Sequence, residues 1–229
     1  MFSVVFEVRP RAGQRDAYLG SVKMVQPEIE RAPGFVDNIR YRSLTRDGWI
    51  LSLSSWRDEE SLVRRRTGID HEDVHEKDRS GILDDYHFRA GPIAYDTRLS
   101  DRCELSVQRI DEADAGEDTA ITLIDAGQAR NWVESHNAQE IALYLGFDLN
   151  SYGDCISWDV FDSLLIPGEI ILLVLWKGQE AAMRFARSAM VPDDSRVRML
   201  RVVRDYAMLD RREAPQYFPD AADRDILRA

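Results

Sequence analysis

The stretch SLTRDGWILSLSSWRDEE, residues 43–60, recurs 120 residues later as SLLIPGEIILLVLWKGQE, residues 163–180. Without a gap, serine, leucine, glycine, isoleucine, tryptophan and glutamate fall at matching positions. A match of this length at a fixed shift indicates an internal duplication. We therefore expect two similar units, with Trp56 and Trp176 in equivalent places.

The elements around the first copy predict one complete unit. Within 43–60, the turn Thr45-Arg46-Asp47-Gly48 separates two apolar runs and is typical of a hairpin. The flanking sequence completes the order βαββαβ, with strands expected at 2–8, 35–44, 49–56 and 86–90 and helices at 14–32 and from Asp58 onward. This order is the ferredoxin-like arrangement, in which both helices pack on one face of an antiparallel sheet.

The second copy extends the same pattern over the rest of the chain. Its first strand is expected at 119–124, its first helix at 127–145 and a buried strand at 170–176. The predicted organisation is an N-terminal repeat at 1–96, a linker at 97–117, a divergent C-terminal repeat at 118–210 and an arm at 211–229. The fold class is α+β, with two ferredoxin-like repeats.

The strand patterns also indicate how the two sheets pack. Phe2, Val4, Phe6 and Val8 alternate with less apolar residues, so that strand has one strongly apolar face. The run 170–176 is apolar on both faces. A strand of this kind is buried on both sides, as it is when helices cover one face and a second sheet covers the other.

Composition excludes several classes of partner and compartment. The net charge of −11, from 41 acidic and 30 basic residues, disfavours nucleic acid and anionic membranes. The two cysteines, Cys103 and Cys155, form neither a disulfide framework nor a zinc motif. The N-terminus lacks the basic region of a signal peptide, and no apolar run is long enough to span a bilayer. We expect a cytoplasmic protein that binds a small molecule.

Five segments carry a resemblance to a known family: FEVRP near the N-terminus, QPEIERAPGF, the run at 43–60, ILDDYHFR at 82–89 and RVVRDYAMLDRREAP at 201–215. They resemble the antibiotic biosynthesis monooxygenase and haem-degrading monooxygenase superfamily. The resemblance implies a dimeric α+β barrel, in which two units pack sheet against sheet, usually between two chains. The two repeats of this chain can form that barrel within one molecule, as in the chlorite-dismutase-like branch, and a homo-oligomer is also compatible.

The haem-degrading members suggest one set of site residues. In them an Asn of the first strand, a Trp of the second helix and a His ten residues later line the pocket, and the His ligates haem iron. By resemblance, Glu7 falls near the Asn, Arg65 at the Trp and His75 at the His, which makes these three the predicted catalytic set. His71 lies four residues before His75 in an acidic segment, so an exposed, charge-paired histidine is the alternative, and no third ligand completes a metal site.

The cofactor-free monooxygenases of the family suggest a second set. In them Trp, Asn, Tyr and Arg side chains bind an acidic aromatic substrate, whose carbanion reacts directly with O2. By resemblance, the predicted substrate-binding residues are Arg40, Tyr41, Trp56, Arg64, Tyr86 and His71. A buried carboxylate or enolate needs a cation, which Arg40 or the arginines at 64–66 would supply. Trp56 has a counterpart in Trp176, which favours a packing role for both.

The two repeats differ at the positions that carry this chemistry. Phe185 and Ser195 stand in the second repeat where Arg65 and His75 stand in the first, so we expect the site in the N-terminal repeat. His136 is the alternative iron ligand on the chlorite-dismutase pattern. We predict a monooxygenase-like protein that acts with O2 on a small aromatic or haem-type substrate, with haem or no cofactor. The alternative is a non-redox binding protein, isomerase or lyase on the same fold.

Overall fold

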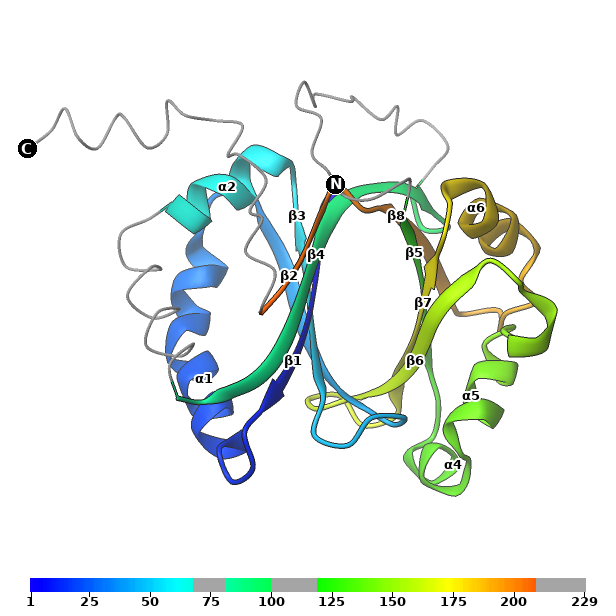
Figure 1. Ribbon diagram of the computed structural model, residues 1–229, viewed down its shortest axis with the longest axis horizontal. Helices are drawn as coiled ribbons and strands as arrows, with labels where there is room; N and C mark the ends of the chain where they lie inside the picture. Colours follow the sequence, from blue (N-terminus) through cyan, green and yellow to red (C-terminus); the bar gives the residue numbers. More distant parts are fainter. Residues whose placement is uncertain (68–80, 100–118, 209–229) are drawn as a thin grey trace, which may run out of the picture.

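The computed structural model of the chain describes residues 1–67, 81–99 and 119–208 (Figure 1). In chain order the described elements are β1 (Phe2–Pro10), α1 (Arg15–Arg31), β2 (Phe35–Ser43), β3 (Ile50–Trp56), α2 (Glu59–Thr67), β4 (Leu83–Asp96), β5 (Ala120–Gly127), α4 (Arg130–Ser135), α5 (Ala138–Tyr144), the 3-10 turn η1 (Leu149–Ser151), β6 (Cys155–Ser163), β7 (Glu169–Trp176), α6 (Gln179–Ser188), β8 (Arg196–Arg201) and β9 (Arg204–Ala207).

The strands form one antiparallel sheet that closes on itself. Its order is β1-β3-β2-β6-β7-β5-β8-β4-β9, and β4 also pairs with β1, which completes a barrel. The N-terminal half contributes the run β4-β1-β3-β2 and the C-terminal half the run β8-β5-β7-β6. The halves meet where β2 pairs with β6 and β4 pairs with β8. The predicted α+β class and its large antiparallel sheet are confirmed.

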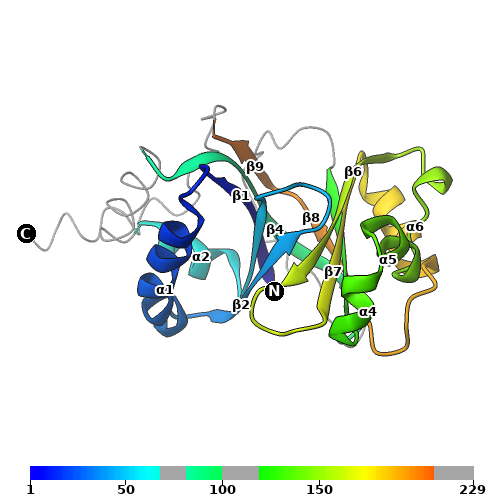
Figure 2. The same cartoon turned by 90° about the horizontal axis from the view of Figure 1, so that it is seen from below.

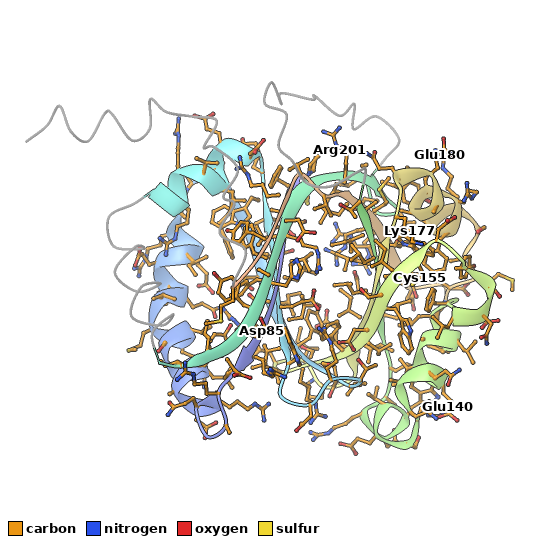
Figure 3. All side chains as sticks on the ribbon, viewed as in Figure 1. Asp85, Glu140, Cys155, Lys177, Glu180 and Arg201 are labelled. Atoms are coloured by element: carbon orange, nitrogen blue, oxygen red, sulfur yellow. The ribbon has the colours of Figure 1, made fainter. Side chains whose placement is uncertain are left out.

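Helices cover the outside of the barrel, and side chains fill its inside. Helices α1 and α2 lie on the outer face of the N-terminal strands, and α4, α5 and α6 lie on that of the C-terminal strands (Figures 1 and 2). Side chains of both halves occupy the space between the facing strands (Figure 3). Their apolar core includes Val5, Leu53, Leu123, Phe161 and Leu173. None of the described helices is long and apolar enough to cross a bilayer.

The two halves share local features at matched positions. Trp56 pairs with Phe2 across β3 and β1, and Trp176 pairs with Ala120 across β7 and β5. Both indoles are buried, at 3% and 1% exposure. The hydroxyl of Ser43 accepts hydrogen bonds from the next hairpin's backbone, and that of Ser163 does the same, 120 residues on.

Local chemistry explains most element boundaries. Gly48 has φ 76°, which is the left-handed conformation that the Asp47-Gly48 turn requires. The helix expected at 127–145 is instead two helices, α4 and α5, so that expectation was wrong. Asn137 is the reason, because its side chain accepts hydrogen bonds from the backbone of Gln139 and Glu140 and begins a new helix with a capping box.

Candidate functional site

The structure divides the predicted site residues between the two faces of the N-terminal sheet. Glu7 and Tyr41 face the barrel interior, where Glu7 contacts Arg89 and Tyr41 belongs to the core between the sheets. Arg40 and Tyr86 face the helices, since Arg40 bonds to α1 and Tyr86 packs against Tyr18 of α1. Neighbouring residues of a strand point to opposite faces, so Arg40 and Tyr41 do not share one pocket.

Glu7 belongs to a network of ion pairs inside the barrel. Its Oε2 accepts a hydrogen bond from Nη1 of Arg89 at 2.7 Å, and its Oε1 pairs with Arg46 of the β2–β3 hairpin. Arg46 also pairs with Asp159 of β6 at 2.7 Å. Burial opposes the charge of Arg46, but the carboxylates of Glu7 and Asp159 outweigh it and raise the Arg46 pKa. Both carboxylate oxygens of Glu7 are thus engaged within the N-terminal half, and Arg46 joins the two halves of the barrel through Asp159.

The second half carries a corresponding pair. Glu7 of β1 is opposite Leu51 of β3, and Asp125 of β5 is opposite Ile171 of β7. Leu51 and Ile171 are matched positions, 120 residues apart. Asp125 pairs with Arg198 as Glu7 pairs with Arg89. A feature present in both halves favours a structural role, because one active site needs only one copy.

Tyr41 lies near Asp125 of the second pair and near a further acidic residue, Glu169. Burial raises its pKa far above the ordinary value, and Glu169 and Asp125 raise it further. Burial and Asp125 likewise raise the pKa of Glu169. The Tyr41 phenol is 1% exposed and therefore stays protonated at neutral pH. Its place suits packing inside the barrel better than proton transfer to a substrate.

The outer face of the N-terminal sheet presents one continuous row of side chains. The strand register aligns, from β2 to β9, Arg40, Ser52, Phe6, Phe88 and Tyr206. The row begins with a cation, continues through a hydroxyl and ends on three aromatic rings. Side chains on adjacent strands at the same level lie close enough to contact one ligand.

Arg40 is the unusual member of this row. It is 7% exposed, and its Nη1 donates a hydrogen bond to Oε1 of Gln26 in α1 at 2.7 Å. Its Nε is buried without a hydrogen-bond acceptor. Burial lowers the Arg40 pKa, although Tyr18 and Glu30 partly offset this effect. Within the described residues no carboxylate lies within ion-pair distance of Arg40, so a buried cation here lacks an anion.

The aromatic part of the row is packed but not closed. The rings of Phe88 and Tyr206 stack at 4.6 Å with an interplanar angle of 15°, and Phe6 lies 6.5 Å from Phe88. Phe6 also contacts Tyr86 at 5.7 Å. Phe6, Phe88 and Tyr206 are all partly exposed. An apolar group of a ligand has a surface to contact beside the buried cation.

The remaining predicted residues are not members of this row, although Phe6 and Phe88 pack against the cluster that contains Trp56. Trp56 is buried in the core and donates a hydrogen bond from Nε1 to Ser54 at 3.1 Å. On α2, Arg64 pairs with Glu60 at the surface, and Arg65 lies 3.5 Å from Glu28 of α1. His71 and His75 fall outside the residues that the structure describes.

Ser52, Phe88 and Tyr206 were missed by the sequence reasoning. Side chains alternate between the two faces of a strand, so the sequence could have shown which face of β3, β4 or β9 each of them occupies. Which strands lie side by side, and in what register, required the structure.

The matching row of the C-terminal half contains no polar side chain. It consists of Val160, Leu172, Ile124 and Val197, joined by the same kind of register. All four are buried at 3% exposure or less and belong to one cluster with Trp176 and Phe185. Within the described residues, the outer face of the N-terminal sheet is thus the better candidate for ligand binding.

The structure describes two of the histidines, His87 and His136, and they differ in how their ring nitrogens are engaged. Nε2 of His87 bonds to Asp205, and Nδ1 lies 3.2 Å from Nη2 of Arg89, so both ring nitrogens are engaged. His136 ends α4, bonds through Nδ1 to the carbonyl of Trp132 and stacks on that ring at 4.2 Å. Its Nε2 has no hydrogen-bond partner among the described residues.

Three comparisons with known proteins bear on this site. The sequence profile described as "Antibiotic biosynthesis monooxygenase" matches residues 1–77. A protein of Pyricularia oryzae named "Jasmonate monooxygenase ABM" is 38% identical over 227 residues, which cover 97% of this chain and 100% of that protein.

Solved structures of aldoxime dehydratase are similar in fold. One, in complex with butyraldoxime, gives a TM-score of 0.54 at 15% identity and covers 90% of this chain and 81% of that one. Another gives 0.52 at 13% identity, with 90% and 83% covered. At these identities the likeness extends to the fold alone.

Proposed function

The chain belongs to the antibiotic biosynthesis monooxygenase family, and on that premise we propose that it inserts one atom of O2 into a small organic acid. We place the substrate on the outer face of the N-terminal sheet, along the row from Arg40 to Phe88. The observation that carries this placement is Arg40, a guanidinium that is 7% exposed and has an unpartnered Nε. Burying a cation without an anion costs several kcal/mol. A substrate carboxylate supplies that anion.

The row then orients the rest of the substrate. With its carboxylate on Arg40, the acid lies across Ser52, whose hydroxyl currently donates to Asn38 at 3.1 Å and is able to accept from a ligand. Its apolar part extends over Phe6 and Phe88. Jasmonate, which the name of the Pyricularia relative contains, is a small carboxylic acid with a cyclopentanone ring and an apolar pentenyl side chain, so it is the first substrate to test.

The chain's own residues supply binding, orientation and exclusion of water. One oxygen atom enters the substrate and the other leaves as water, with the two electrons drawn from the substrate or from an added reductant. Arg40 stabilises negative charge on the bound acid, and the aromatic rings keep water from the reacting part. Glu7 and Tyr41, on the other face of the sheet, take no part in binding in this proposal.

We also propose that the two halves are copies of one ferredoxin-like unit. The matched tryptophans, hairpin serines and ion pairs support this origin. The second copy has lost polar groups from its helix-covered face and serves as the scaffold that closes the barrel.

The direct test is incubation of the purified protein with jasmonate under ¹⁸O2. We expect one labelled oxygen atom in the product by mass spectrometry, first without and then with a reductant such as NADH. Binding of jasmonate without oxygen uptake under either condition would overturn the oxygenase proposal and favour the binding-protein alternative.

A further inference from the structure

Strand β9 belongs to the C-terminal half by sequence but pairs with the N-terminal sheet. Strand β8 pairs with both β5 and β4, and the chain then continues along β4, where β9 pairs only with β4 among the described strands. The carbonyl of Ala90 in β4 accepts a hydrogen bond from the backbone of Val203, just before β9. The last described strand of one half therefore forms the edge of the other half's sheet.

Side chains on both faces fix β9 in place. Toward the barrel, Asp205 bonds to His87 and lies 3.3 Å from Nε of Arg89. Toward the helices, Nη2 of Arg204 lies 2.7 Å from the carboxylate of Glu59 in α2. Arg204 is 3% exposed, so this ion pair is buried. Tyr206 directly follows these two anchored residues, on the same face of β9 as Arg204.

Tyr206 ends the row that begins at Arg40. Its ring stacks on that of Phe88 at 4.6 Å, and it packs against the cluster of Tyr18 and Tyr86 near the N-terminal end of α1. Strands in a sheet lie about 4.8 Å apart, so Phe88 is three spacings, or roughly 14 Å, from Arg40 along the row. Beyond Phe88, the Tyr206 ring occupies the path that a longer ligand would take.

We infer that Tyr206 is a specificity-determining residue that limits the length of the acid held by Arg40. The inference rests on the proposed function, because it takes Arg40 as the fixed end of the ligand. The site then takes an amphipathic monocarboxylic acid of limited length, and the C-terminal half sets that limit through β9.

The test measures binding of a series of straight-chain fatty acids, from octanoate to myristate, to the full chain by calorimetry. Each buried methylene adds about fourfold in affinity. For the wild type we expect affinity to rise with length and then to fall at a definite limit. In Tyr206→Ala the limit should move to longer acids, with a gain of at least about fourfold for the first acid beyond it.

Further variants distinguish an effect of the Tyr206 ring from a general loosening of strand β9. Tyr206→Phe keeps the stacked ring and should keep the limit, whereas the bulkier Tyr206→Trp should move it to shorter acids. Tyr152→Ala, in the aromatic cluster of the C-terminal half, is the matched control and should not move it.

The outcomes separate the two proposals. If no acid binds the wild type, both the proposed site and this inference fail. If acids bind with the same limit in wild type, Tyr206→Ala and Tyr206→Trp, or with no limit in the wild type, only the role of Tyr206 is overturned.

Discussion

Helix α1 of the N-terminal half and helix α6 of the C-terminal half cover corresponding sheets in different ways. Helix α1 has 17 residues but buries only Tyr18 among them. Helix α6 has 10 residues and buries four, namely Ala181, Ala182, Phe185 and Ala186. Helix α1 therefore contributes fewer fully buried side chains to its layer than α6 does.

The clusters beneath these helices show the same contrast. The C-terminal layer is one continuous core that contains Trp176, Phe147 and Leu172. The N-terminal layer is divided into two smaller cores, one around Trp56 and one around Tyr18. The polar positions Arg40 and Ser52 lie on the same sheet face as these cores. A few polar side chains therefore distinguish the candidate binding layer from the packed layer, while the strand pairing is the same in both.

The largest effect on the free energy of unfolding should come from placing the residue of one half at the matching position of the other half. Leu172→Ser places a hydroxyl and a cavity in a position that is fully buried, and we expect a loss of about 4 kcal/mol in the free energy of unfolding. Ser52→Leu, at the matching N-terminal position, should change that free energy by less than about 1 kcal/mol. Urea unfolding followed by tryptophan fluorescence measures both.

The same pair of variants also separates stability from binding. Ser52→Leu should weaken binding of jasmonate, since its side chain would fill the row beside Arg40. Equal destabilisation by the two exchanges would show that both layers are packed alike and would remove the contrast.

Neutralising Glu7 should give the next largest effect on stability. Glu7→Gln leaves Arg89, which is 8% exposed, and Arg46 with a weaker partner, so we expect a loss of about 3 kcal/mol. Acid binding should be nearly unchanged, because Glu7 faces the barrel and not the row. Asp125→Asn in the second half is the matched control and should behave similarly. A selective loss of turnover in the folded Glu7→Gln protein would instead support the catalytic role predicted from the sequence.

Removing the charge that anchors β9 should give a smaller and pH-dependent effect. Burial works against ionisation of Asp205, but the hydrogen bond from His87 and the charge of Arg89 outweigh it and lower its pKa from the ordinary 3.8. A carboxyl with a lowered pKa stabilises the fold above its unfolded pKa, and this contribution disappears as the pH falls through the folded pKa. Asp205→Asn should therefore cost about 1 to 2 kcal/mol at neutral pH.

The difference between wild type and Asp205→Asn should shrink as the pH falls below about 4. Unfolding curves collected from neutral to acidic pH measure this difference. A constant difference across that range would show that Asp205 contributes through contacts other than its charge.

Much of the fold followed from the sequence, and the division of the site did not. The 120-residue match and the Asp47-Gly48 turn predicted the hairpins and the paired tryptophans, because turn chemistry and strand alternation are local signals. Arg40 and Tyr41 were assigned to one pocket although neighbouring strand residues face opposite sides. Tyr206 was not found because its pairing with Phe88 joins segments 118 residues apart, which no local pattern reports.

The proposed binding site depends most directly on Arg40 as the anchor of a bound acid. We propose measuring the affinity of jasmonate for Arg40→Gln and for Arg42→Gln, whose arginine lies on the same strand but pairs with Asp162 at 2.8 Å and is half exposed. We predict that Arg40→Gln weakens binding by about 10- to 100-fold with no loss in stability, whereas Arg42→Gln leaves binding unchanged. Unaltered binding by Arg40→Gln, or an equal loss in both variants, would contradict the account.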